Sequence, residues 1–138
     1  MMCPDTETLL AYVKVELFFA AICYYIKINP KPITAMAKKI AEQLIDTLVE
    51  SGVERIYAVT GDSLNEVNEA VRKNNKIQWI HVRHEETGAY AAAAEAQLTG
   101  RIGCCAGSSG PGHVHLINGL YDAQRSGAPV IAIASTIP

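Results

Sequence analysis

The sequence predicts an α/β fold: a doubly wound parallel sheet with helices on both faces. Short apolar segments at 56–59, 77–82, 102–106 and 130–134 run continuously, as strands that are buried on both faces do. The segments between them have helical periodicity, so strands and helices alternate along the chain. With 138 residues, 49% of them hydrophobic and 19% charged, the composition suits one domain with one core.

Local signals predict four helices. The first helix stops at Gly52. Its apolar stripe is formed by Ile40, Ala41, Leu44, Ile45 and Leu48. Ser63 and Glu66 have the spacing of a capping box, which predicts a helix over 64–73. A third helix is predicted over 86–98. Pro111 suits the first position of a fourth helix, which would run to about residue 125.

Residues 1–34 differ from the rest of the chain. The segment 9–28 is apolar and has about the length of a membrane span, but Lys14, Glu16 and Lys27 interrupt it. Acidic rather than basic residues precede it, unlike in a signal peptide. The competing interpretations are a membrane anchor and an amino-terminal extension outside the fold. We expect the extension, with the folded domain at 35–138 and no membrane contact.

Charge and cysteine content exclude several classes of function. The net charge of −2 provides no basic surface for nucleic acid, so we expect no nucleic-acid partner. The four cysteines, Cys3, Cys23, Cys104 and Cys105, include no CxxC pair of the kind that binds zinc or carries redox chemistry. Cys104 and Cys105 are adjacent in a predicted strand, so their side chains should point to opposite faces. We expect buried thiols, in a protein of the reducing cytoplasm.

Three predicted strands end in turns that could carry chemistry, at 61–63, 83–85 and 107–112. Because the strands are parallel, all three turns should lie at one edge of the sheet, where ligands bind in such folds. Glu85 puts a carboxylate at this edge. Walled by apolar residues, this carboxylate could hold or pass a proton near neutrality. The alternative is that Glu85 and Glu86 are ordinary acids in the first turn of a helix, where the helix dipole favours them.

Other types of site fit the sequence less well. The glycine-rich turn has the order GxxGxG rather than GxGxxG, no GxxxxGK[ST] occurs, and Ser108 and Ser109 lack the GxSxG frame of a hydrolase. His113 and His115 are two apart on a predicted helix, so they do not share a face. We therefore predict no metal site and interpret the histidines as individual polar or capping groups, at His81, His84, His113 and His115.

From Met36 the sequence resembles the amino-terminal, pyrimidine-binding (PYR) domain of thiamine-diphosphate enzymes. The likeness is closest to the branch of pyruvate oxidase and quinone-linked pyruvate dehydrogenase. It is carried by stretches in the family order, at 50–56, 59–65, 83–86, 94–98, 105–112 and 115–122. The resemblance implies a flavodoxin-like order of the strands.

The resemblance also implies roles for particular residues. In that family the glutamate that matches Glu85 hydrogen-bonds N1′ of the cofactor's aminopyrimidine and so activates thiamine diphosphate to decarboxylate a 2-oxo acid. Glu86 would be turned elsewhere. Pyruvate or another 2-oxo acid is the implied substrate, and magnesium and FAD are implied further cofactors. The pyrimidine pocket would be lined by Gly110, Pro111 and Gly112, and the substrate side by Gly61 and Asp62.

The sequence also departs from the family. The family's diphosphate-binding domain carries a GDG motif for the metal ion and the diphosphate, and the 138 residues contain no GDG. The central domain that carries FAD is absent as well, and the PYR fold would stop after its fourth strand. In this family a second subunit completes each cofactor site. We therefore expect this chain to supply half a site and to be inactive alone.

Other functions stay open at this point. The chain could be a non-catalytic module that pairs with full-length subunits through the small-residue helix at 89–94, or a truncated gene product with little function. Within the enzyme class, acetolactate synthesis is a sister chemistry of pyruvate oxidation. The residues that select the 2-oxo acid and the electron acceptor lie mostly outside this chain.

Overall fold

The computed structural model describes residues 37–136. The amino-terminal extension predicted at 1–34, which includes Cys3 and Cys23, lies outside the described residues. From Lys38 the chain forms one compact unit. Between residues 37 and 136, no helix is both long enough and apolar enough to cross a membrane.

The described part of the chain contains a parallel sheet of four strands, β1 (Arg55–Ala58), β2 (Gln78–His81), β3 (Gly103–Gly107) and β4 (Val130–Ala134). The strand order is β2-β1-β3-β4, so β1 pairs with both β2 and β3. The register of β1 on β3 places Tyr57 beside Cys105 and Ala58 beside Ala106. The predicted doubly wound sheet is confirmed, and its order is that of a flavodoxin-like fold.

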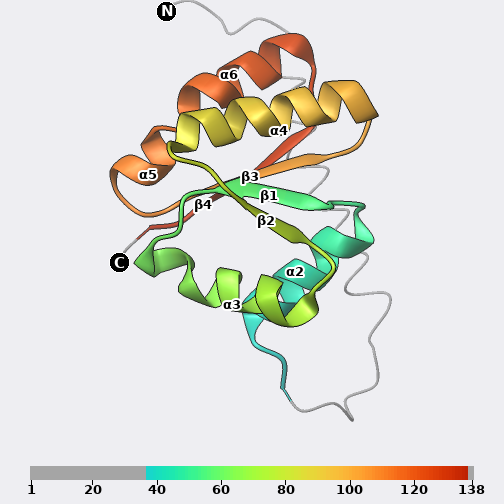
Figure 1. The fold of residues 1–138 in the computed structure, drawn as a ribbon, viewed down its shortest axis with the longest axis vertical. Helices are drawn as coiled ribbons and strands as arrows, with labels where there is room; N and C mark the ends of the chain where they lie inside the picture. Colours follow the sequence, from blue (N-terminus) through green and yellow to red (C-terminus); the bar gives the residue numbers. More distant parts are fainter. Residues whose placement is uncertain (1–36, 137–138) are drawn as a thin grey trace, which may run out of the picture. The chain divides into compact units, whose positions relative to one another are not determined.

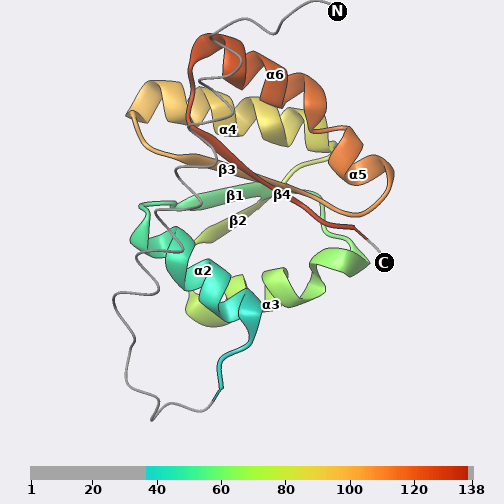
Figure 2. The ribbon, with the colours of Figure 1, turned by 180° about the vertical axis from the view of Figure 1, so that it is seen from behind.

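Helices cover both faces of this sheet, as Figure 1 shows and Figure 2 repeats from behind. On one face lie α2 (Ile40–Glu50) and α3 (Asn65–Asn74), and on the other lie α4 (Glu85–Thr99) and α6 (Ile117–Ser126). Two short helices, η1 (Asp62–Leu64) and α5 (Pro111–Val114), begin within the turns that follow β1 and β3. The chemistry-bearing turns are therefore held between a strand and a helix.

Two apolar cores lie on the two faces of the sheet. Cys104 packs in the core that contains Ile45 and Ile56, whereas Cys105 packs with Ala92 and Leu116. Both thiols are buried, which confirms the predicted opposite orientation of these neighbours. Burial raises the pKa of the Cys105 thiol to about 12, so the thiol stays protonated at neutral pH.

Small residues let α4 approach its neighbours closely. A Cβ on Gly103 would overlap the Ala92 carbonyl oxygen, and a Cβ on Gly119 would lie 2.5 Å from the Ala89 Cβ. Ala89, Ala92 and Ala93 are buried inside this unit. Of the alanines considered for pairing with another subunit, these three pack inside the unit while Ala94 is exposed, and pairing through this helix stays a prediction.

The capping box predicted at Ser63 and Glu66 is wrong. α3 has no side-chain cap at its amino end, and the 3-10 helix η1 leads into it instead. Ser63 does not cap the helix because its hydroxyl lies within hydrogen-bond distance of the Ser108 and Ser135 hydroxyls. Tertiary contacts have overridden a local pattern.

Two further helix predictions need correction. The helix predicted over 111–125 is divided into α5 and α6, because the Leu116 N–H bonds to the His113 carbonyl three residues back and tightens the chain there. The predicted stripe of α2 is only partly buried, since Ile40 is 87% exposed and Leu44 is 37% exposed. Both of these side chains lie outside the core that α2 forms with the sheet.

Burial differs among the strands. Every residue of β3 is buried, as predicted for a strand covered on both faces. In β2, which has a strand on one side only within the described sheet, Gln78 and His81 are exposed. A continuous apolar run therefore predicts a strand correctly but does not predict full burial at the edge of the sheet.

Candidate functional site

The candidate site lies where the strand order reverses. The chain passes from β1 to β2 on one side and then crosses to β3 on the other side of β1. In doubly wound sheets, ligands bind at such a point, in the crevice outside the carboxyl ends of the strands. The turns at 61–63, 83–85 and 107–112 meet here, as the sequence predicts for a parallel sheet.

Three serines tie together the turns after β1, β3 and β4. Ser63 Oγ lies 2.9 Å from Ser108 Oγ and 2.7 Å from Ser135 Oγ. It also accepts a hydrogen bond of 2.9 Å from the Ser109 N–H. Ser135 Oγ in turn donates to the Gly107 carbonyl at 3.1 Å. These bonds join segments far apart in the sequence and fix this edge of the sheet.

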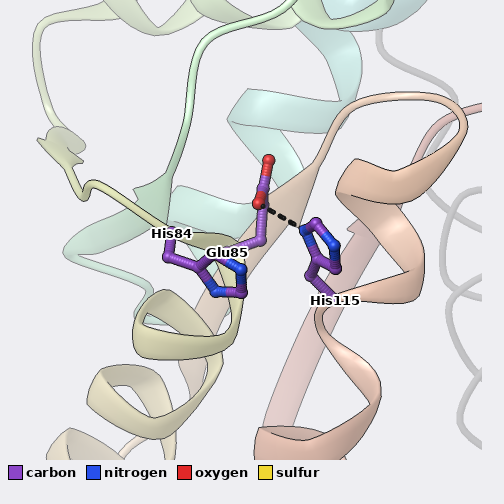
Figure 3. Close-up of side chains that lie close together, drawn as sticks. All are labelled: His84, Glu85 and His115. Carbon is purple, nitrogen blue, oxygen red and sulfur yellow. Dashed lines mark hydrogen bonds and ion pairs between the residues drawn. The ribbon is translucent and has the colours of Figure 1, made fainter.

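Glu85, the first residue of α4, carries the carboxylate of the site (Figure 3). Its side chain is 12% exposed, and its Oε2 lies 3.1 Å from Nδ1 of His115. Its Oε1 lies 3.2 Å from the point that a Cβ on Gly112 would occupy. The missing side chain at residue 112 thus leaves room for the carboxylate against the glycine-rich turn.

Two histidines flank this carboxylate. His84 caps α4, because its Nδ1 accepts a hydrogen bond of 3.3 Å from the Glu86 N–H. Its ring stacks on the ring of His115, with centroids 4.5 Å apart and planes inclined by 24°. The prediction that His84 is a capping group is confirmed. The interpretation of His84 and His115 as separate groups is wrong, because α4 and the end of α5 bring them together.

Glu86 points to a different partner from its neighbour. Its Oε1 accepts a hydrogen bond of 3.0 Å from the Asn118 side-chain amide. This bond joins the first turn of α4 to the first turn of α6. Glu86 therefore connects two helices, while Glu85 faces the glycine-rich turn.

The glycine-rich turn requires glycine at two positions. A Cβ on Gly107 would lie 2.6 Å from the Gly112 carbonyl oxygen, so a side chain there would prevent the turn from closing. Gly110 has φ +74°, a conformation that residues with side chains rarely adopt. Pro111 then begins α5, as predicted. This tight path brings Gly112 against Glu85.

Gly61 and Asp62 follow β1 at the same edge of the sheet. A Cβ on Gly61 would overlap the side chain of Ser108, so Gly61 allows two turns to pack together. Asp62 begins η1, and its side chain is exposed. Their role on the substrate side stays a prediction.

Sequence reasoning missed His115 and the serine cluster as parts of the site. No local pattern places Ser63 against hydroxyls that are 45 and 72 residues further along the chain. His115 carried one available signal: it lies in the stretch 115–122, which contributes to the family resemblance. That signal marks the residue without saying which residue it touches.

The surroundings of the carboxylate differ from the apolar wall that we expected. One oxygen of Glu85 faces an imidazole and the other faces backbone at Gly112. A partly buried carboxylate beside an imidazole can hold or exchange a proton. Backbone without side chains lets a flat ring come close. These residues therefore fit a flat heterocycle with a hydrogen-bonding nitrogen, such as an aminopyrimidine.

Comparisons with known proteins show which proteins this chain is similar to. Residues 38–138 match the family described as "Thiamine pyrophosphate enzyme, N-terminal TPP binding domain". The chain is 57% identical over 100 residues to an uncharacterized 42.6 kDa protein in the isoamylase 3′ region of Pseudomonas amyloderamosa. This match covers 72% of this chain and 25% of that protein. The chain is 53% identical over 104 residues to the putative thiamine pyrophosphate-containing protein YdaP of Bacillus subtilis, covering 74% of this chain and 18% of YdaP.

Two relatives have named activities. Pyruvate oxidase of Lactiplantibacillus plantarum is 50% identical over 91 residues, 65% of this chain and 15% of that enzyme. Acetolactate synthase 3, chloroplastic, of Brassica napus is 35% identical over 101 residues, 73% of this chain and 16% of that enzyme. The chain thus spans a quarter or less of the length of these relatives. Together with the family match over residues 38–138, they show that the chain belongs to the thiamine pyrophosphate enzymes, through their N-terminal TPP-binding domain.

Proposed function

We propose that this chain is the pyrimidine-binding half of a thiamine-diphosphate enzyme that decarboxylates and oxidises pyruvate, with Glu85 bonded to N1′ of the aminopyrimidine. The observation that carries the proposal is the position of the Glu85 carboxylate. It is 12% exposed, and one of its oxygens faces the backbone of Gly112 at the switch point of the sheet. A flat ring that enters over the turn at 110–112 would meet this carboxylate.

Each residue has a separate task in this proposal. Glu85 holds or gives a proton at the oxygen that faces the ring nitrogen. His115, at 3.1 Å, holds the other carboxylate oxygen and so fixes the rotation of the side chain. Gly110, Pro111 and Gly112 form the wall of the pyrimidine pocket, and Gly61 and Asp62 lie on the substrate side. When bound, the cofactor supplies the electron sink for decarboxylation.

The choice of pyruvate oxidation over acetolactate synthesis is supported by the degree of identity. The pyruvate oxidase relative is 50% identical, whereas the acetolactate synthase relative is 35% identical. Magnesium would then be held by a diphosphate-binding domain, since the 138 residues contain no GDG motif, and FAD by the central domain that the family carries. A second subunit or a diphosphate-binding domain would complete the site, and we place the enzyme in the cytoplasm with residues 1–34 outside the family fold.

The experiment that tests the function is exchange of the cofactor's C2 proton. The chain is joined to the diphosphate-binding domain of a relative, and Glu85→Gln is compared with the unchanged protein. We expect exchange to slow by at least about 100-fold, the usual size of a lost acid–base group, with the fold intact by circular dichroism.

Glu86→Gln is the matched control. It changes the adjacent carboxylate, which bonds to Asn118 and not to the turn, so exchange should stay near that of the unchanged protein. Normal exchange in Glu85→Gln would remove Glu85 from the mechanism. The 138-residue chain alone should show no turnover of pyruvate with thiamine diphosphate and magnesium, because the motif for the diphosphate is missing.

A further inference from the structure

Three metal-binding side chains converge at the start of α4. His84, Glu85 and His115 each offer one ligand atom, and these atoms all lie within 4.8 Å of one another. Figure 3 shows the two imidazoles and the carboxylate beside one another, with the Glu85–His115 contact as a dashed line. The pair at its centre is already close, with Glu85 Oε2 3.1 Å from His115 Nδ1.

Two imidazoles and one carboxylate are a donor set that zinc uses. Zn²⁺ binds nitrogen and oxygen ligands at about 2.0–2.1 Å, which puts two ligands of a tetrahedral ion roughly 3.3 Å apart. The Glu85–His115 separation of 3.1 Å is close to that spacing, so a cation could replace this contact once the His115 ring has turned a nitrogen lone pair toward the ion. Three protein ligands would leave one position for water.

His84 can complete the set by turning its side chain. Its Nδ1 accepts the Glu86 N–H and so uses the one ring-nitrogen lone pair of a neutral imidazole, which means that the ring must release this N–H before it can bind an ion. The side chains of His84 and His115 are 48% and 42% exposed, so an ion can reach them from solvent. The rings are stacked with centroids 4.5 Å apart, and because nitrogen lone pairs lie in the ring planes, one exposed ring must rotate out of the stack for both rings to point at one ion.

Charge at this position also permits a cation. The amino end of α4 carries a partial positive charge, which by itself would disfavour a metal ion. Two carboxylates offset it: Glu85 as a ligand, and Glu86, whose Oε2 lies 3.9 Å from His84 Nδ1. The buried thiols of Cys104 and Cys105 do not compete for the ion, since burial keeps them protonated.

We propose that His84, Glu85 and His115 form a binding site for one divalent transition-metal ion of the Zn²⁺ class. The site revises the expectation from sequence that the histidines act separately and that no metal is bound. Because Glu85 is shared, Zn²⁺ and an aminopyrimidine that needs the same carboxylate exclude each other, so zinc acts as an inhibitor. That consequence rests on the proposed function, whereas the zinc site itself does not.

The test is isothermal titration calorimetry, in which Zn²⁺ alone is added to the full 138-residue chain. Cys3→Ser and Cys23→Ser are introduced first, so that neither of these thiols can bind zinc. We expect one Zn²⁺ per chain. Binding should weaken by at least about tenfold in each of the three ligand variants, Glu85→Gln, His84→Asn and His115→Asn. Loss of a residue that only supports a metal ligand already weakens binding by about tenfold or more.

His81→Asn is the matched control, because His81 is exposed on β2 and is not among the three ligands. It should bind zinc like the parent chain. Co²⁺ in place of Zn²⁺ gives a second measurement, since four-coordinate Co²⁺ absorbs visible light strongly. A folded parent chain that binds no Zn²⁺, or ligand variants that bind as tightly as the His81 control, would overturn the site. No cofactor is present, so this result is independent of the proposed function.

Discussion

Glu85 and Gly112 meet at the switch point of the sheet, where a Cβ on Gly112 would lie 3.2 Å from Glu85 Oε1. The carboxylate comes from the start of α4 and the glycine from α5, two helices that follow different strands. Their contact joins the predicted proton-carrying group to the predicted wall of the pocket. It also makes the size of residue 112 a determinant of where the carboxylate lies.

The first prediction concerns this contact. Gly112→Ala places a methyl group against Oε1, so the carboxylate must shift by a few tenths of an ångström. Because residue 112 lies in a helix, where alanine is favoured by roughly 0.5–1 kcal/mol, we expect stability to change by less than about 1 kcal/mol. When the chain is joined to the diphosphate-binding domain of a relative, exchange of the cofactor's C2 proton should slow in this variant.

Gly110→Ala is the comparison variant for Gly112→Ala, because the opposite result is expected for stability. A Cβ at residue 110 meets nothing within 4 Å, but the backbone has φ +74°, so alanine should cost about 1–3 kcal/mol of stability. Urea denaturation measures both variants. Equal stability losses for Gly110→Ala and Gly112→Ala would contradict the expected difference in backbone strain, and unchanged proton exchange in Gly112→Ala would show that residue 112 does not position Glu85.

The second prediction concerns the close packing of α4 on α6. Alanine in place of glycine normally stabilises a helix by about 1 kcal/mol. A Cβ on Gly119, however, would lie 2.5 Å from the Ala89 Cβ and 2.7 Å from the Tyr90 backbone nitrogen, so the helices must move apart. We expect Gly119→Ala to destabilise the fold by about 1–2 kcal/mol, because overpacking outweighs helix propensity. Gln124→Ala, at an exposed position of α6, is the control, and a more stable Gly119→Ala would contradict the packing.

The third prediction concerns the serine cluster. Ser63→Ala removes the acceptor for the Ser109 N–H and the contacts to Ser108 and Ser135. A partly buried N–H left without its partner costs about 1–3 kcal/mol, and we expect that loss in urea denaturation. Ser51→Ala serves as the control, since its hydroxyl bonds only to a carbonyl of its own helix. Equal losses in the two variants would mean that Ser63 does not join the turns.

The fourth prediction is a pH dependence from the buried thiol of Cys105. Its pKa in the folded state is about 12, above the ordinary value of 9.0, so the folded state holds the proton more tightly than the unfolded state does. The contribution of the protonated Cys105 thiol to stability is complete below pH 9. This contribution falls as the pH rises toward 12, by up to about 1.4 kcal/mol per pH unit. The free energy of unfolding of Cys105→Ala should therefore fall less steeply above pH 9 than that of the parent chain. Parallel curves would show that the thiol is not buried in solution.

Much of the fold follows from local patterns in the sequence. The apolar runs and the helical periodicity predicted the four described strands and the parallel arrangement, and the adjacent Cys104 and Cys105 were correctly assigned to opposite faces. These features depend on neighbours a few residues apart, which is the range over which strand and helix geometry acts. The family resemblance added the identity of the chain to this picture.

The candidate site was only partly predictable for the same reason. Glu85 and the turn at 107–112 were identified because each stands directly after a strand. The capping-box prediction for Ser63 failed because partners much further along the chain took its hydroxyl. The division between α5 and α6 followed from a backbone bond that the periodicity of the sequence does not encode.

By itself, the sequence determined the order of the strands and helices, the carboxylate at the start of α4 and membership of the thiamine pyrophosphate enzymes. Only the tertiary structure decided what that carboxylate touches. It placed His115 at 3.1 Å from Glu85, stacked His84 on His115 and set Gly112 against the other oxygen. These contacts depend on how α4 and α5 pack over the same sheet, a three-dimensional arrangement that the spacing of residues along one helix or strand does not specify.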